Sequence, residues 1–251
     1  ELEELVGQTI TEKGLGGEKA LELFVDTLAP ACISEDHPRY LAFVPTAPSE
    51  VSALFDLVVG ASNICASSWL EGAGAIYAEN QALRWIADIA GLPPEAGGVF
   101  VSGGTAGNLS ALVAARHDWR QKSPDHQHQR GLIISSRGAH ASVDQAAQVM
   151  DADIVQSGGH RLTGADVAAT IAALSEEDRL RLFAVACTAG TTNLGIIDDL
   201  EGIGDVCADE DGAVIVDDRR GVDPVSLRSR ARLQAFAPAR GQSAEDVIGG
   251  N

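Results

Sequence analysis

The sequence predicts an α/β protein, with a mainly parallel sheet covered by helices on both faces. Short apolar runs alternate along the chain with longer segments in which apolar residues recur at helical spacing. Apolar residues form 45% of the 251 residues, while aromatic residues form only 4%. Because parallel strands are buried on both faces, they appear as continuous apolar runs, and this is the pattern found here.

The N-terminal part of the chain is expected to form a helix followed by an extended arm. Apolar residues at helical spacing predict a helix within residues 1–30. The next segment, 33–49, reads ISEDHPRYLAFVPTAPS, and its prolines predict an extended conformation. Helical spacing returns at 49–60 and at 74–90.

From residue 99 onward, strands and helices are expected to alternate. The predicted strands are 99–101, 131–136, 152–157, 181–188 and 212–218. The predicted helices are 105–119, 142–151, one that starts at Thr163, and 199–210. Thr163 and Asp166 have the spacing of a capping box. In the helix 105–119, three side chains are expected to face the sheet: Leu109, Leu112 and Val113.

The chain is therefore divided into three regions. Residues 1–48 are the N-terminal helix and arm, and 49–218 are the α/β domain. The last region, 219–251, carries six of the arginines and shows neither strand nor helix periodicity. Its composition changes abruptly after Asp218, which predicts a disordered tail and a shift of reading frame near codons 217–219.

Composition excludes several classes of function. The net charge is −18 and no basic stripe is present, which argues against nucleic-acid binding. No apolar run reaches the roughly 18 residues that a membrane helix needs. The four cysteines form no C-x-x-C pair and so do not match the usual zinc patterns. We expect a cytoplasmic protein whose acidity serves solubility.

The stretch SGGTAGNL (102–109) is the first candidate site, because a double glycine precedes a predicted helix. Free backbone N–H groups at a helix N-terminus bind anions, so a phosphate could lie near Gly104 and Thr105, with the hydroxyl of Ser102 or Thr105 assisting. The alternative is an ordinary strand-to-helix turn. No lysine follows as in a P-loop, and the pattern is not G-x-G-x-x-G.

Three further candidates follow predicted strands, where ligands of parallel sheets bind. His140 could stack on a flat ligand or be a surface loop residue. Thr191 and Thr192, in TAGTTN, could bind a ligand or simply form a turn. Asp217 ends the apolar run AVIVD and could face a ligand cation or be the first solvated residue after a buried strand.

Taken in order, six motifs resemble the group II pyridoxal-5′-phosphate-dependent amino-acid decarboxylases, such as the aromatic-amino-acid, glutamate and diaminobutyrate decarboxylases. The resemblance extends from about residue 20 to Asp217. The motifs are HPRYLAFVPTAPS, WLEGAGAIYAENQALRWIADIAGLP, GGVFVSGGTAGNLSALVAAR, AHASVDQAA, TAGTTNLGIIDDLEGIGDVC and an apolar strand ending in Asp. The resemblance implies the large domain of a fold type I pyridoxal-phosphate enzyme, present here incompletely.

The resemblance also implies roles for the candidate residues. Gly104 and Thr105 would hold the phosphate of pyridoxal phosphate, and His140 would stack over its pyridine ring. Asp217 would pair with the pyridinium nitrogen and keep it protonated, so that the ring acts as an electron sink. His140 and Asp217 would thus be the catalytic residues.

Two more positions match the family near the ligand, and one essential residue has no match. Thr192 matches a threonine near the cofactor, and Thr46 matches a residue near the substrate carboxylate. The family forms its Schiff base with a lysine that follows a histidine, downstream of a small, glycine-rich segment. After Asp217 this chain instead reads DRRGV. Its three lysines, Lys13, Lys19 and Lys122, lie outside that position.

The expected function is therefore that of a pyridoxal-phosphate-dependent carboxy-lyase of amino-acid metabolism. We expect this chain to be a fragment without the Schiff-base lysine, inactive alone, and to form a homodimer or to pair with a full-length subunit. The alternative is a non-catalytic module that pairs with the intact enzyme. A dinucleotide-binding domain is the second rival, but its G-x-G-x-x-G loop is absent.

Overall fold

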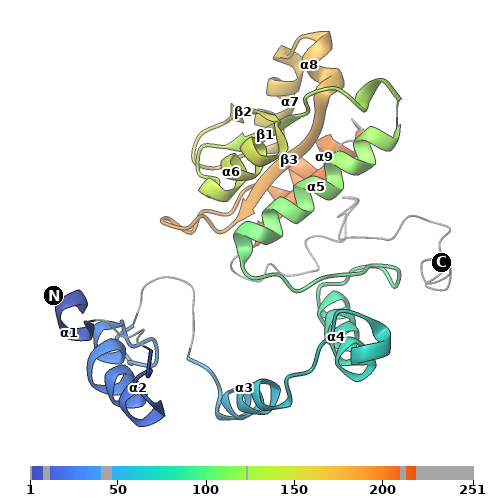
Figure 1. Ribbon diagram of the computed structural model, residues 1–251. Helices are drawn as coiled ribbons and strands as arrows, with labels where there is room; N and C mark the ends of the chain where they lie inside the picture. Colours follow the sequence, from blue (N-terminus) through green and yellow to red (C-terminus); the bar gives the residue numbers. More distant parts are fainter. Residues whose placement is uncertain (1, 8–11, 41–46, 123, 210–212, 219–251) are drawn as a thin grey trace. The chain divides into compact units, whose positions relative to one another are not determined.

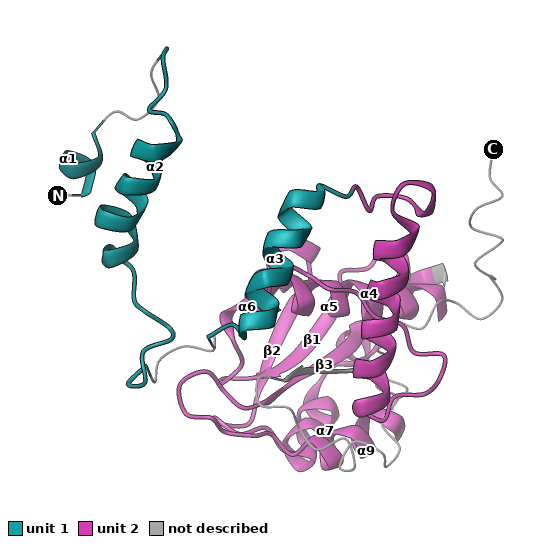
Figure 2. Cartoon of the chain, turned by 90° about the horizontal axis from the view of Figure 1, so that it is seen from below, with its two compact units in different colours: residues 1–64 teal, residues 65–251 magenta. Residues whose placement is uncertain are grey.

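The computed structural model describes residues 2–7, 12–40, 47–122, 124–209 and 213–218. Two compact units are distinguished, Glu1–Ile64 and Cys65–Asn251, coloured teal and magenta in Figure 2. The expected boundary after residue 48 stays a prediction. The tail 219–251 lies outside the described residues, as does Thr46.

The N-terminal unit is helical but less regular than the sequence suggests. Its elements are α1 (Leu2–Val6), α2 (Gly17–Leu23), the π-helix η1 (Phe24–Leu28), the 3₁₀-helix η2 (Ala29–Ala31) and α3 (Glu50–Ser62). The expected helix within 1–30 is interrupted, because Gly14 and Gly16 have φ values of 66° and 83°, outside the helical range. Ser49 caps α3, its side chain accepting a hydrogen bond from the Ser52 N–H at 3.3 Å.

The second unit contains the expected parallel sheet (Figure 1). Its strands are β1 (Leu132–Ser136), β2 (Asp153–Ser157), β3 (Leu182–Ala189) and β4 (Ala213–Asp218). The order across the sheet is β2-β1-β3-β4, and every pairing is parallel. The helices are α4 (Trp69–Ile89), α5 (Gly104–Lys122), η3 (Pro124–His126), α6 (Ala141–Met150), α7 (Gly164–Ala173), α8 (Glu176–Arg181) and α9 (Leu200–Asp209).

Helices cover both faces of this sheet, as the sequence predicts. Side chains of successive strand residues point to opposite faces. Ile133 of β1 packs in a core with residues of α5 and α6, whereas its neighbour Ile134 packs with residues of α7 and α9. Likewise, Ala184 of β3 belongs to the first core and Val185 to the second. The two inner strands β1 and β3 are therefore buried on both sides, which explains their continuous apolar sequences.

Side-chain caps begin two of the helices, and one of the two caps was predicted. The Thr163 side chain accepts a hydrogen bond from the Asp166 N–H at 3.2 Å, and the Asp166 carboxylate accepts one from the Thr163 N–H at 3.1 Å. This is the capping box expected at the start of α7. A second cap, which the sequence did not reveal, lies at α6, where His140 is the N-cap residue.

Three local expectations are corrected by the structure. Residues 99–101 do not form a strand: the described strands provide no partner for them, and Val99, Phe100 and Val101 are each more than 40% exposed. Val113 is 40% exposed rather than facing the sheet, whereas Leu112, one residue earlier, is fully buried. The short helix α8 was not predicted. No helix in the described ranges is long and apolar enough to cross a membrane.

At the amino end of the sheet, an ion-pair cluster joins the starts of three strands. The Asp153 carboxylate, at the start of β2, binds Arg130 Nε and Arg181 Nη1, both at 2.7 Å. Arg130 precedes β1, and Arg181 directly precedes β3. Arg181 also donates to the Arg130 carbonyl at 3.1 Å. The hydrogen bond from Arg181, together with that from Arg130, lowers the pKa of Asp153.

Candidate functional site

The candidate residues lie around the carboxyl edge of the sheet. In the parallel ladder, Thr188 near the end of β3 is the register partner of Asp217 near the end of β4. On the other side of β3, Ser135 of β1 pairs with Ala186. The chain leaves β1 after Ser136 and reaches His140 within four residues. The ends of β1, β3 and β4 therefore bring the His140 loop, the 188–193 segment and Asp217 to one edge.

The first turn of α5 supplies backbone donors at this edge. Gly103 accepts the first helical hydrogen bond, from the Gly107 N–H at 3.1 Å, so the N–H groups of Gly104, Thr105 and Ala106 precede the helical ladder. Gly104 and Thr105 are exposed, and a methyl group added at Gly103 or Gly104 would meet no atom within 4 Å. This helix end is open to an anion.

A buried hydrogen bond joins the starts of α5 and α6. Asn108, one turn after Gly104, donates from Nδ2 to Ser142 Oγ at 2.8 Å. Ser142 is fully buried and Asn108 is 7% exposed. Because Ser142 lies two residues after His140, this contact places the candidate phosphate-binding turn beside the candidate stacking histidine. These two side chains were not singled out from the sequence.

His140 is held by the helix that it begins. Its Nδ1 accepts the Ser142 backbone N–H at 3.2 Å and lies 2.8 Å from Ser142 Oγ. The side chain is half-buried. An imidazole in this position is oriented by its own N-cap bond, and one of its two ring nitrogens is already used.

The loop after β3 packs against the loop that carries His140. A methyl group added at Gly138 would lie 2.8 Å from the His160 carbonyl oxygen and 3.2 Å from Thr191 Cγ2, so only glycine fits there. Thr191 is buried, and its hydroxyl accepts the Ile196 N–H at 3.0 Å. Thr192, by contrast, is exposed. Of the two threonines, Thr191 therefore shapes the loop, and Thr192 is accessible to a ligand.

A buried carboxylate fixes the base of the same loop. Asp198 is 2% exposed, and its two oxygens accept the backbone N–H groups of Leu162 and Thr188, each at 2.7 Å. Burial raises the pKa of this carboxyl group, and the two backbone hydrogen bonds oppose the rise. Asp198 was not predicted from the sequence; the only signal available was an acidic residue directly after the apolar pair Ile196–Ile197.

The structure brings some of the predicted site residues together and places others only by their backbone. It brings the turns of Gly104, Thr105 and His140 together, with Thr192 on the adjacent loop. Asp217 is placed at the edge by its backbone register. Ser102 lies in an exposed bend directly before the α5 turn.

Lys122, the lysine of the second unit, lies away from this edge. Lys122 ends α5, about 27 Å from Gly104 at 1.5 Å per helical residue, and pairs with Asp118 at 3.4 Å. Lys13 and Lys19 belong to the N-terminal unit.

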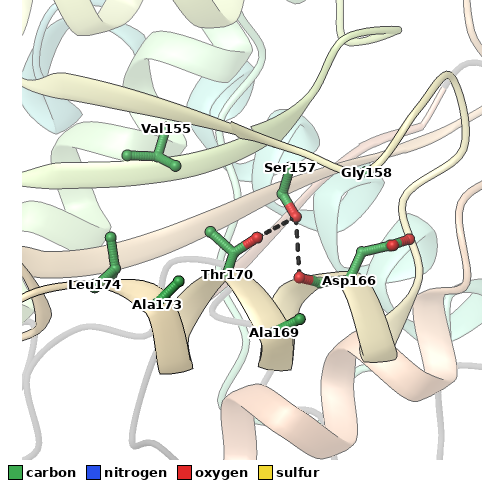
Figure 3. Close-up of a pocket in the computed structure, with 8 residues that line it drawn as sticks. All are labelled: Val155, Ser157, Gly158, Asp166, Ala169, Thr170, Ala173 and Leu174. Carbon is green, nitrogen blue, oxygen red and sulfur yellow. Dashed lines mark hydrogen bonds between the residues drawn. The ribbon is translucent and has the colours of Figure 1, made fainter.

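A separate pocket of about 450 Å³ lies between the edge strand β2 and α7 (Figure 3). Ser157, which lines it, has its hydroxyl within 2.6 Å of Thr170 Oγ1 and donates to the Asp166 carbonyl at 3.1 Å. None of the predicted site residues lines this pocket. The candidate site is therefore the edge formed by the loops, and not this cavity.

Comparison with known proteins identifies relatives for most of the chain. Residues 2–219 match the family model described as the pyridoxal-dependent decarboxylase conserved domain. An aromatic-L-amino-acid decarboxylase from Bacillus atrophaeus is 30% identical over 240 residues, which cover 91% of this chain and 48% of that protein. An L-2,4-diaminobutyrate decarboxylase from Rhizobium meliloti is 30% identical over 209 residues, 81% of this chain and 41% of that protein.

Solved structures agree on the fold. One match is a crystal structure from Vibrio parahaemolyticus, the glutamate decarboxylase domain of diaminobutyrate-pyruvate transaminase and L-2,4-diaminobutyrate decarboxylase. Its TM-score is 0.79 at 24% identity, over 92% of this chain and 55% of that one. Oryza sativa TDC with PLP and tryptamine matches with a TM-score of 0.76 at 21% identity, over 86% of this chain and 47% of that one. The chain spans about half the length of the curated relatives it matches.

Proposed function

Because the chain belongs to the pyridoxal-dependent decarboxylase family, we propose that its second unit binds pyridoxal 5′-phosphate at the carboxyl edge of the sheet. The parallel sheet with helices on both faces is the fold type I architecture expected from the resemblance. The observation that carries the proposal is that two helix starts, joined by the Asn108–Ser142 hydrogen bond, meet at the edge where Asp217 lies near the end of β4.

The open end of α5 fits the phosphate. Its first N–H groups precede the helical ladder, and the helix dipole adds a partial positive charge at this end. Gly103 and Gly104 leave the space in front of the turn free of side chains. We assign Gly104 and Thr105 to the phosphate, with the Thr105 hydroxyl as an additional donor and Ser102 as its neighbour on the loop.

The surrounding residues fit the ring of the cofactor. We assign His140 to its face, since the imidazole is half-buried and fixed by Ser142. Asp217 is assigned to the ring nitrogen, where a carboxylate would hold a proton, and Thr192 to a neighbouring polar position. When bound, the cofactor withdraws electrons from the substrate carbon that loses carboxylate. Thr46 is proposed to lie near the substrate carboxylate, by its match to the family alone.

We propose an amino acid as substrate and decarboxylation as the reaction of the complete assembly. This chain by itself is proposed not to turn over, because a lysine that could bond to the cofactor is absent from the site residues assigned here. The proposed partner is a second copy or a full-length subunit that supplies the rest of the site. A cytoplasmic location, expected from the sequence, is proposed with it.

One observation favours the alternative function, a non-catalytic module that pairs with a complete decarboxylase subunit. Helix α3 has no buried residue, although it is rich in large apolar side chains. Those more than 60% exposed are Val51, Leu54, Phe55, Leu57 and Val59. Helices that are apolar on so much of their surface pack against another surface, and a decarboxylase subunit could supply one. Co-purification of this chain with an intact decarboxylase subunit tests the alternative directly.

Titration of the purified chain with pyridoxal phosphate, in parallel with pyridoxal and NAD, tests the proposed function. We expect saturable binding of pyridoxal phosphate, weaker binding of pyridoxal, which lacks the phosphate, and none of NAD. Binding of NAD but not of pyridoxal phosphate would replace the proposal by the dinucleotide-binding alternative. Equal affinity for pyridoxal and its phosphate would remove α5 from the site.

A further inference from the structure

The hydrogen bonds around His140 determine which of its ring nitrogens carries the proton. A backbone N–H can only donate, so the contact from Ser142 N to His140 Nδ1 at 3.2 Å requires Nδ1 to be an unprotonated acceptor. The neutral ring then carries its proton on Nε2. Within the described part of the chain, Nε2 has no hydrogen-bond partner, and the half-buried ring leaves it accessible.

Asn108 extends this arrangement to α5. Its Nδ2 group donates to Ser142 Oγ at 2.8 Å, so the hydroxyl oxygen is used as an acceptor and the hydroxyl proton is directed elsewhere. The closest acceptor is His140 Nδ1, 2.8 Å from the same oxygen. Donation therefore runs in one direction, from Asn108 through Ser142 to His140.

Because Asn108 and Ser142 are buried, their hydrogen bonds are costly to lose. Ser142 is fully buried and Asn108 nearly so, and buried polar groups that lose a partner are costly because water cannot replace it. The first turn of α5 and the histidine are consequently coupled through two side chains that are almost completely buried.

We propose that Asn108 and Ser142 are positioning residues that hold His140 as the Nε2–H tautomer. Nε2–H then remains available as a hydrogen-bond donor. The inference rests on the proposed function for its role, since a neutral ring with a fixed donor can lie against a protonated pyridine ring without repulsion between like charges. The tautomer itself is a property of the chain without cofactor.

Nuclear magnetic resonance of the chain with ¹⁵N-labelled histidine tests the proposal, without any added ligand. Long-range proton–nitrogen correlations distinguish protonated from unprotonated ring nitrogens, and loss of one signal set in His140→Gln identifies the residue. We expect an unprotonated Nδ1 and a protonated Nε2 in the parent chain. In Ser142→Ala, which removes the hydroxyl but keeps the backbone N–H, Nδ1 retains one of its two donors, so both shifts should move part of the way toward intermediate values.

Asn108→Asp provides the sharper variant, because a carboxylate cannot donate. The Ser142 hydroxyl should then turn its proton to the new carboxylate and accept from His140, which raises the population of the Nδ1–H tautomer. Ser175→Ala, which removes a hydroxyl at the exposed start of α8, is the matched control and should leave His140 unchanged. Amide spectra establish folding of each variant, and either variant alone decides the question.

The proposal is overturned if the parent chain shows Nδ1–H, or if a folded Asn108→Asp or Ser142→Ala protein keeps the parent tautomer ratio. Titration with pyridoxal phosphate is recorded separately on the same samples. A tautomer change without cofactor binding would contradict only the proposed function. Cofactor binding with an unchanged tautomer would contradict only the positioning role.

Discussion

The backbone N–H of Thr188 donates to Asp198 Oδ2 at 2.7 Å, and the Asp198 N–H donates back to the Thr188 carbonyl at 3.0 Å. This reciprocal pair closes the loop 188–198 at the end of β3. Because Thr188 is also the register partner of Asp217, the carboxylate secures the strand end beside the proposed cofactor residue. Asp198 Oδ1 extends the connection to the Leu162 N–H, directly before α7.

Asp198→Asn should destabilise the chain. An amide has one oxygen, so one of the two buried N–H donors would face an NH₂ group, at a cost of roughly 1–3 kcal/mol. Asp198→Ala, which removes both acceptors, should cost more. Urea unfolding monitored by circular dichroism measures the change. The exposed Asp205→Asn, on α9, is the control and should change stability by less than about 0.5 kcal/mol. Equal stability of Asp198→Asn and the parent chain would contradict the role assigned to the carboxylate.

The raised pKa of Asp198 also has a consequence for pH. A carboxyl group whose pKa is higher in the folded than in the unfolded chain favours folding at low pH, and this contribution is lost as pH rises through the folded value. The penalty for burying its charge is therefore present at neutral pH. It offsets part of the gain from its two hydrogen bonds, so the measured cost of Asp198→Asn should be larger near pH 4 than at pH 8.

Thr105→Ala tests the phosphate position. If the hydroxyl donates to a charged phosphate, its loss should weaken binding of pyridoxal phosphate by roughly 1.5–3 kcal/mol. Absorbance titration gives the affinities. The affinity for pyridoxal, which has no phosphate, should be the same in the variant and in the parent chain. A loss of equal size for both ligands would place Thr105 away from the phosphate.

The order of the elements could be predicted because it depends on local periodicity. All four strands of the sheet coincide with predicted apolar runs to within one residue at each end, and the capping box of α7 was visible in Thr163 and Asp166. The segment 99–101 has the same apolar pattern yet forms no strand. A strand requires a neighbour for its backbone groups, and sequence periodicity does not contain that information.

The candidate site could be predicted only in part, for a similar reason. Gly104, Thr105 and His140 lie next to strand or helix boundaries, which are local signals. Asn108 and Ser142 are 34 residues apart in sequence, and their hydrogen bond depends on how α5 packs beside α6. A single asparagine or serine within a helix carries no sign of such a distant partner. Buried polar links of this kind emerge only from the tertiary structure.

Asp217→Asn should affect the cofactor's spectrum more than its affinity. A neutral amide no longer favours a proton on the pyridine nitrogen, so the absorbance of bound pyridoxal phosphate should move toward that of the unprotonated ring. Affinity should fall less than in Thr105→Ala, because the phosphate contacts remain. Asp218→Asn changes the net charge by the same amount at the adjacent position and is the control. Identical spectra for the two variants would contradict the assignment of Asp217.

The sequence positions of the three lysines, none of which matches the Schiff-base lysine of the family, predict non-covalent binding. Pyridoxal phosphate bound to this chain should have the absorbance of the free aldehyde, and borohydride should not fix it stoichiometrically to one residue. Peptide mass spectrometry after reduction provides the measurement. Lys122→Arg, which keeps the pairing with Asp118 possible, should behave as the parent chain does. One lysine modified in stoichiometric amount would show that covalent chemistry is available to this chain.

The last prediction concerns acid stability and the cluster at the amino end of the sheet. Hydrogen bonds from Arg181 and Arg130 lower the pKa of Asp153 from its ordinary value of 3.8. A carboxyl group with a lowered folded pKa stabilises the fold above its unfolded pKa, and this stabilisation is lost as pH falls through the folded value. Asp153→Asn should therefore be less stable than the parent chain at pH 7, and the difference should shrink below about pH 4.

Urea unfolding at several pH values between 3 and 7 measures this difference. Asp151→Asn is the matched control, because Asp151 also pairs with Arg130, at 2.6 Å, but its side chain is 80% exposed. Its left-handed backbone, with a φ of 54°, suits asparagine as well as aspartate. An exposed pair contributes little, so the control should show a smaller and flatter pH effect. A constant difference between Asp153→Asn and the parent chain across this range would show that the ion pairs to β2 do not stabilise the sheet.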